Sequence, residues 1–231
     1  MTRALGRGAA LLVGLVGYGF SMAVMVRSGL GLDPWDVFHQ GLANRTGLTI
    51  GTVTAVVGVL VLLAWIPLRN RPGIGTVANV VVIAVTVDAA LAVLPEPTGL
   101  PVRVSMMLGA VLLNAVSTVL YIAAGLGPGP RDGLMTGLVG RTGLSVRLVR
   151  TSIEATVLAA GWLLGGTVGI GTVVYAFGIG PLVQLTLRLT PQRWLATSGW
   201  AESEGADPGL TTMGECQPIP ASEPKTSTPT C

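Results

Sequence analysis

Ionisable and amide side chains interrupt the apolar stretches of this sequence at only a few positions. Asp36 and Asp132 each follow a proline by two residues in two similar segments, and His39 and Gln40 come shortly after the first of them. Carboxylate, imidazole and amide groups can exchange protons, hold ions or hydrogen-bond to polar solutes. The candidate substrate-binding residues are Asp36, His39, Gln40, Asn79, Asp88, Asn114 and Asp132.

Asp88 is the acid that lies deepest within an apolar run. Because an ionisable group inside a membrane is costly, Asp88 is a candidate contact for a coupling ion or a substrate. The structural alternative is that Asp88 pairs with an arginine or lies near the outer surface. Glu154 has a structural explanation of its own, since Arg150 lies four residues earlier on the same helix face.

The residue patterns of enzymes and metal sites are missing from the sequence. His39 is the only histidine, and the two cysteines, Cys216 and Cys231, both lie near the C-terminus. The sequence has no HExxH motif, no nucleophile elbow and no phosphate-binding loop. We therefore expect no enzymatic activity, no metal and no cofactor.

Transmembrane helices are the elements expected to position the polar residues. Hydrophobic residues make up 50% of the chain and charged residues 11%, whereas about a quarter of the residues in soluble domains are charged. Several apolar runs reach the roughly 20 residues that cross a bilayer core. The predicted spans are residues 8–27, 49–67, 74–95, 104–124, 150–167 and 170–188.

Positive charge is distributed unevenly between the two ends of these spans. With the N-terminus in the cytoplasm, ten arginines fall inside, and only Arg27, Arg45 and Arg103 fall outside. Cytoplasmic loops carry such an excess, so both termini are predicted to lie inside. The net charge of +3 therefore indicates orientation in a lipid bilayer, and no nucleic-acid partner is expected, because no basic stripe alternates with aromatic residues.

The sequence repeats itself at a constant offset of 96 residues. GLGLDPWD begins at Gly29 and GLGPGPRD at Gly125, an RTGL follows in both copies, and the register continues to GIGTV at Gly73 and Gly169. Each copy holds three predicted spans, and an odd number inverts the second copy relative to the first. We predict an all-α membrane fold of two inverted three-helix repeats, residues 1–95 and 104–190.

A break in each repeat is followed by a short helix, over residues 34–46 and 130–142. Pro34 and Pro130 suit the first helical position, and Asp36 and Asp132 then meet free amide groups near the helix start. One interpretation is an interfacial helix that lies flat on the membrane surface. The other is a re-entrant helix that lines a cavity at depth. The sequence is compatible with both.

The C-terminal segment, residues 195–231, differs from the rest of the chain. It is rich in Pro, Ser, Thr and Gly and carries most of the glutamates. Such a composition buries too little apolar surface to fold alone. We predict a disordered cytoplasmic tail.

The segment from Gly29 to Thr52, GLGLDPWDVFHQGLANRTGLTIGT, resembles the bacterial YczE-like membrane proteins, which are grouped with YyaS- and YitT-type proteins. The resemblance covers residues 8–190. It implies a multi-pass protein of the bacterial inner membrane and assigns no catalytic residue.

A secondary transporter or permease-like protein is the function that this organisation favours. Gly- and Pro-interrupted segments at matching positions of two halves point to a transport site. The expected substrate is an unknown small molecule or ion, and a homodimer could complete the pathway. The alternative is a membrane protein that does not transport but binds or regulates a partner.

Overall fold

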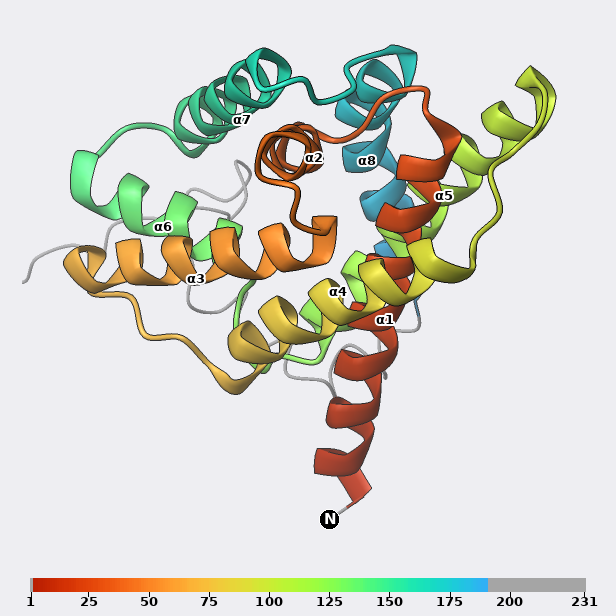
Figure 1. Ribbon diagram of the computed structural model, residues 1–231. Helices are drawn as coiled ribbons and strands as arrows, with labels where there is room; N and C mark the ends of the chain where they lie inside the picture. The colour runs from red at the N-terminus through yellow and green to blue at the C-terminus, as the bar shows by residue number, and fades with distance from the viewer. Residues whose placement is uncertain (1, 191–231) are drawn as a thin grey trace, which may run out of the picture.

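The computed structural model describes residues 2–190, and the predicted tail over 195–231 lies outside this range. The described chain is all helical (Figure 1). The helices are α1 (Thr2–Ser28), α2 (Pro34–Thr46), α3 (Ile50–Leu68), α4 (Ile74–Val93), α5 (Leu100–Ala123), α6 (Pro130–Thr142), α7 (Val146–Leu163) and α8 (Ile170–Leu189).

Five of these helices, α1, α3, α4, α5 and α8, are long and apolar enough to cross a membrane. Their side chains face outward in a way that suits lipid, since residues such as Leu60, Val81 and Phe177 are largely exposed. The predicted all-α fold with several membrane helices is confirmed. The fifth predicted span, residues 150–167, corresponds to α7, which is not among these five helices and carries Arg147, Arg150 and Glu154; its role as a span stays a prediction.

Local capping explains where the helices differ from the predicted spans. The helix α7 begins at Val146, four residues earlier than predicted, because Ser145 accepts a hydrogen bond from the Leu148 amide and caps it. Similarly, α5 begins at Leu100 rather than at residue 104, with a proline in its first turn. Serine and proline are favoured at these two places in a helix.

The helix boundaries recur at the 96-residue offset. Pro34 and Pro130 begin α2 and α6, and Gly47 and Gly143 follow their ends with φ angles of 73° and 68°. In the breaks that precede these helices, Gly31 and Gly127 have φ angles of 119° and 125°. Side chains disfavour such angles, so the repeated glycines allow the same turns in both halves.

In each half, the N-terminus of the last helix forms a backbone hydrogen bond to the helix break of the other half. The Gly75 amide of α4 donates a hydrogen bond to the Leu126 carbonyl oxygen at 2.8 Å, and the Gly171 amide of α8 donates to the Leu30 carbonyl oxygen at 2.8 Å. These bonds pair polar backbone groups that a membrane would otherwise leave unsatisfied. Residues 30 and 126 are therefore fixed by equivalent partners.

Two arginines donate hydrogen bonds to the carbonyl groups at helix C-termini. Arg7 Nε donates to the Ala124 carbonyl oxygen at the end of α5 at 2.8 Å, and Arg103 Nε donates to the Ser28 carbonyl oxygen at the end of α1 at 2.6 Å. The last carbonyl groups of a helix lack partners within the helix, and a cation there also meets the negative end of its dipole. The two arginines are again 96 residues apart.

Longer helices cover the two short ones. The helix α2 packs against α7 and α3, and α6 packs against α3 and α7. Figure 1 shows α2 nearly end-on, close to the centre of the molecule. A Cβ atom on Gly161 of α7 would collide with the backbone of Phe38 in α2, and one on Gly133 of α6 would collide with the ring of Trp65 in α3. Glycine therefore permits both close approaches.

Candidate functional site

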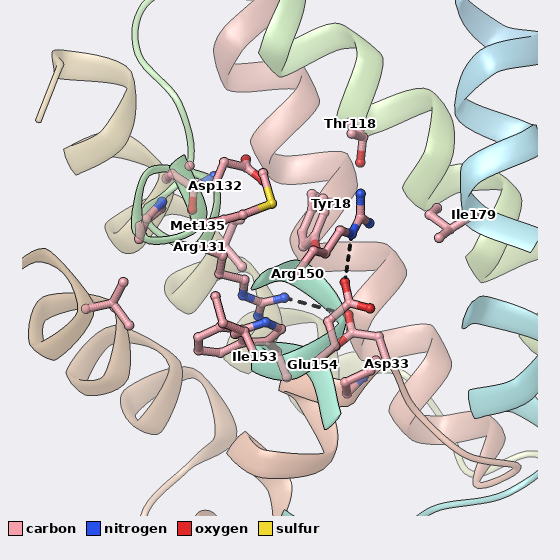
Figure 2. Close-up of a pocket in the computed structure, with 18 of the residues that line it drawn as sticks. Tyr18, Asp33, Thr118, Arg131, Asp132, Met135, Arg150, Ile153, Glu154 and Ile179 are labelled. Atoms are coloured by element: carbon pink, nitrogen blue, oxygen red, sulfur yellow. Dashed lines mark hydrogen bonds and ion pairs between the residues drawn. The ribbon is translucent and has the colours of Figure 1, made fainter. Parts of the chain in front are cut away.

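A cavity of about 450 Å³ lies among the helices and is lined by both repeats (Figure 2). This volume is in the range of small-molecule sites, roughly 300–1,000 Å³. Carboxylates, guanidinium groups and aromatic rings all reach it. Its charged lining residues are Asp33, Arg131, Asp132, Arg150 and Glu154. Polar and charged groups inside an apolar helical protein are expensive and usually functional.

Asp33 places the start of α2 beside the cavity. It is the N-cap residue of α2, and its Oδ1 accepts a hydrogen bond from the Asp36 amide at 2.8 Å. Asp36 lies at the third helical position, as predicted, but the cap itself is Asp33. The Asp36 carboxylate is therefore free to interact with other side chains. Gly129 occupies the equivalent cap position of α6 and offers no side chain.

Four residues form a group that we call the acid–arginine cluster: the buried residues Asp33, Asp36 and His39, and the partly exposed Arg131. Arg131 Nη2 lies 3.4 Å from Asp36 Oδ1, and Arg131 Nη1 lies 3.8 Å from Asp33 Oδ2. The two aspartate side chains are 5% and 4% exposed. Such burial of charge is tolerated only where the charges are paired. One guanidinium group thus serves two carboxylates.

His39 extends the cluster toward α3. Its Nδ1 lies 3.4 Å from Asp36 Oδ1 and 3.3 Å from the hydroxyl oxygen of Thr54. The side chain of His39 is buried and also lines the cavity. An imidazole between a carboxylate and a hydroxyl can accept or release a proton.

Arg131 and Trp35 occupy equivalent positions of the two repeats and meet each other. The guanidinium carbon of Arg131 lies 5.0 Å from the centroid of the Trp35 ring. This distance is that of a cation–π interaction, which strengthens where water is excluded. A position at which the two repeats differ in residue type therefore joins the two short helices.

Asp132 is the equivalent of Asp36 but lies outside the cluster. Within residues 2–190 its carboxylate forms no ion pair. It lines the cavity beside Gly129, where a Cβ atom would lie 3.1 Å from Asp132 Oδ2 and 3.7 Å from both Asn79 Nδ2 and the Tyr121 hydroxyl oxygen. Asp132, Asn79 and Tyr121 thus converge on one part of the cavity wall.

Asn114 lies behind the main cavity rather than in its wall. Its Oδ1 accepts a hydrogen bond from the Tyr175 hydroxyl at 3.1 Å, and its Nδ2 donates to the Ser21 hydroxyl at 3.0 Å. The equivalent positions of the other half hold Tyr18 and Asn79, and both line the cavity. Asn114 therefore positions Tyr175, which is itself a lining residue.

Two predicted site residues lie away from the cavity wall. Gln40 accepts a hydrogen bond from the Thr167 amide at 2.6 Å and ties α2 to the segment before α8. Asp88 accepts hydrogen bonds from the Thr49 hydroxyl at 2.6 Å and the Gly51 amide at 2.8 Å, at the start of α3. Both side chains thus hold backbone or cap groups, and a substrate role for them stays a prediction.

Other residues at the site were not predicted from the sequence. Asp33, Arg131 and the three tyrosines, Tyr18, Tyr121 and Tyr175, all line the cavity. The chain contains only these three tyrosines. The sequence does carry a signal for these tyrosines, because each of them interrupts an apolar run. Asp33 also precedes Pro34, and aspartate is favoured at that N-cap position.

The chain is similar to several bacterial proteins. Residues 5–188 match the family model described as "Family of unknown function (DUF6198)". A protein of Haemophilus influenzae named "Uncharacterized protein" is 42% identical over 78% of this chain and 82% of its own length. From Bacillus subtilis, "Uncharacterized membrane protein YczE" is 34% identical over 75% of this chain and 80% of its own length.

A second protein of Bacillus subtilis, "Uncharacterized protein YyaS", is 23% identical over 80% of this chain and 94% of its own length. No solved structure matches. The match over residues 5–188 agrees with the extent of the resemblance seen in the sequence. The chain therefore belongs to the DUF6198 family of YczE-like proteins and is a multi-pass membrane protein.

Proposed function

We propose that this protein is a small secondary transporter whose substrate occupies the central cavity. The observation that carries the proposal is the acid–arginine cluster, which both repeats build at their helix breaks and which adjoins a cavity of about 450 Å³. Substrate sites of secondary transporters lie at the interface of two repeats and are formed by interrupted helices. We propose that the substrate site of this chain likewise lies between the two repeats and is formed by their interrupted helices.

The two halves would be inverted three-span repeats, related by a pseudo-two-fold axis in the membrane plane. The reciprocal hydrogen bonds of Gly75 to Leu126 and of Gly171 to Leu30 support such a relation. In this arrangement α7 also spans the membrane and brings the number of spans to six. Its Arg150 and Glu154 line the cavity and pair with each other, which would keep both charges out of lipid. Both termini would lie in the cytoplasm, as the arginine distribution predicts.

The short helices α2 and α6 would be re-entrant rather than interfacial. Trp35, Asp36, Val37 and His39 of α2 are all buried, whereas an interfacial helix exposes a polar face. Polar helix starts at membrane depth are stable where protein surrounds them or a cavity adjoins them. The cover provided by α7 and α3 meets this condition.

An asymmetry between the halves suggests how access to the cavity would alternate. In the first half α3 packs along α4, and a Cβ atom on Gly58 would lie 3.6 Å from Val80 Cβ. The equivalent position to Gly58 is Glu154 in α7, and α7 makes no comparable contact with α8. We infer that the cavity is closed between α3 and α4 and open between α7 and α8. Exchange of these two conformations would expose it to the other side.

Cysteine labelling from each side of the membrane tests the proposal without knowledge of the substrate. After Cys216 and Cys231 are replaced by serine, Met135→Cys places a thiol in the cavity wall. A membrane-impermeant maleimide is then applied to right-side-out and inside-out vesicles. We expect the thiol to react from both sides, because each state opens the cavity to one side.

The matched control is Val81→Cys, on an exposed apolar face of α4. This thiol faces lipid in the proposed arrangement and is expected to stay unlabelled from both sides. Reaction of the Met135→Cys thiol from one side only, in protein that inserts normally, would support a fixed binding pocket and contradict transport.

A further inference from the structure

The charges that face the cavity are out of balance. Glu154 Oε1 pairs with Arg150 Nε at 3.0 Å, so these two residues neutralise each other. Among the remaining charged groups of the cavity and its cluster, three are aspartates and one is Arg131. Carboxyl groups therefore outnumber cationic groups at the cavity, and an entering cation would find more partners there than an entering anion. In a region of low dielectric constant, such differences are large.

Asp132 is the carboxylate with the greatest freedom to accept a cation. The two aspartates of the cluster already share Arg131, but Asp132 has no ion-pair partner within residues 2–190. Asn79 Nδ2 and the Tyr121 hydroxyl oxygen lie at the same part of the wall. The Tyr121 hydroxyl oxygen can accept a hydrogen bond from a primary ammonium group.

Aromatic rings supply the second element of a cation site. Trp35, Tyr18, Tyr121 and Tyr175 all line the cavity. The faces of such rings attract cations, and aromatic residues that surround an ammonium group are a recurrent mode of recognition. Arg131 already uses this chemistry, since it lies between the Trp35 ring and the two cluster aspartates.

The donor set favours an organic cation over a metal ion. In the described part of the chain, no group of three or more His, Cys, Asp or Glu side chains could hold a metal. Hard metal ions require several oxygen ligands at short distances. A cavity of about 450 Å³ with several rings and one carboxylate that has no ion-pair partner within residues 2–190 suits a charged amine of a few carbon atoms better.

We propose that the cavity binds a small organic cation, with its ammonium group between the Asp132 carboxylate and the tyrosine rings. The proposal rests on the proposed function and deepens it by naming the substrate class. Arg131 would offset the charge of the cluster carboxylates and so stabilise the fold, while the Asp132 carboxylate would select a cationic substrate.

Binding of three compounds of nearly the same shape tests the proposal on the full-length protein in detergent. The first is choline, the second is its uncharged isostere 3,3-dimethylbutan-1-ol, and the third is the anion 3,3-dimethylbutyrate. Affinity is measured by isothermal titration and thermal stabilisation, and n-butylammonium serves as a second cation. We expect the two cations to bind and the neutral and anionic compounds not to bind.

The variant Asp132→Asn removes the charge and keeps the size of the side chain. It is expected to weaken cation binding by about tenfold or more, which corresponds to roughly 1.4 kcal/mol. Glu96→Gln is the matched control, because Glu96 is an exposed acid outside the cavity, paired with Arg27. This control variant is expected to bind the cations like the unmodified protein.

Three results would overturn the proposal: tighter binding of the anion, equal binding of choline and its neutral isostere, or no binding of either cation. An equal loss of affinity in Asp132→Asn and Glu96→Gln would also overturn it. The two proposals can fail separately. If the protein binds no cation but the cavity thiol reacts from both sides, the substrate class is wrong and transport is still supported. If the protein binds cations but the thiol reacts from one side only, the cation site is supported and transport is contradicted.

Discussion

Arg131 is the residue on which the charge of the cluster depends. Its guanidinium group lies within 4 Å of both Asp33 and Asp36 and packs over Trp35. The repeat places tryptophan at the equivalent position of the first half, so a single arginine breaks the symmetry of the two short helices. The cluster therefore has one cation for two buried carboxylates.

Removal of this cation should destabilise the protein strongly. Arg131→Met keeps much of the volume of the side chain but removes the guanidinium partner of two buried carboxylates, and breaking a buried ion pair costs about 3–5 kcal/mol in comparable cases. We expect a large fall in the melting temperature of the detergent-solubilised protein. Addition of Asp36→Asn should restore much of the loss, because it removes one of the two unpaired charges. An unchanged melting temperature in Arg131→Met would contradict the arrangement of the cluster.

At the scale of helices, the two short elements depend on glycine at their contacts. Gly133 of α6 lies against the ring of Trp65 in α3, and the indole Nε1 of Trp65 donates to the Pro130 carbonyl oxygen at 3.0 Å. This contact fixes the helix that carries Arg131 and Asp132. On the same helix, Gly140 has no atom within 4 Å of the position that a Cβ would take.

These two glycines form a matched pair for mutation. Gly133→Ala should lower stability by about 1–3 kcal/mol, because the methyl group would overpack the contact with Trp65. Gly140→Ala should be neutral or stabilising by up to about 1 kcal/mol, since alanine favours helix and the space is open. Thermal unfolding of both variants in the same detergent measures the difference. Equal melting temperatures would show that α6 does not press against Trp65.

Local sequence features predicted much of the helical organisation. Pro34 and Pro130 mark the starts of the two short helices, and the 96-residue offset identifies equivalent elements. Both follow from local chemistry, since proline and glycine restrict or permit particular backbone angles. The exact start of α7 was missed, because Ser145 caps the helix within a polar stretch that hydropathy excludes.

At the scale of the whole molecule, the candidate site was predicted only in part. Asp36, His39, Asn79 and Asp132 do reach the cavity or its cluster, while Asp88 caps α3. The repeat identifies equivalent positions but does not say which of them meet. The approach of Arg131 to Trp35 and the convergence of the tyrosines depend on packing between distant helices. Information of that kind lies outside any local pattern.

The asymmetry between the halves is the feature from which we infer motion of the whole molecule. Gly58 lets α3 close on α4, whereas the equivalent position of α7 carries Glu154, which lines the cavity. If the halves exchange conformations, α7 must close on α8 in a second state. The residues that would then meet are Glu154 and Ala176, the equivalents of Gly58 and Val80.

Disulfide formation in native membranes tests whether the two halves exchange conformations. In a background without Cys216 and Cys231, Gly58→Cys with Val80→Cys is the reference pair, because its predicted Cβ separation of 3.6 Å suits a disulfide. We expect Glu154→Cys with Ala176→Cys also to cross-link under mild oxidation. A molecule with all four cysteines is expected to form one bond or the other, not both. Cross-linking of the reference pair alone, with the second pair always reduced, would contradict alternating access.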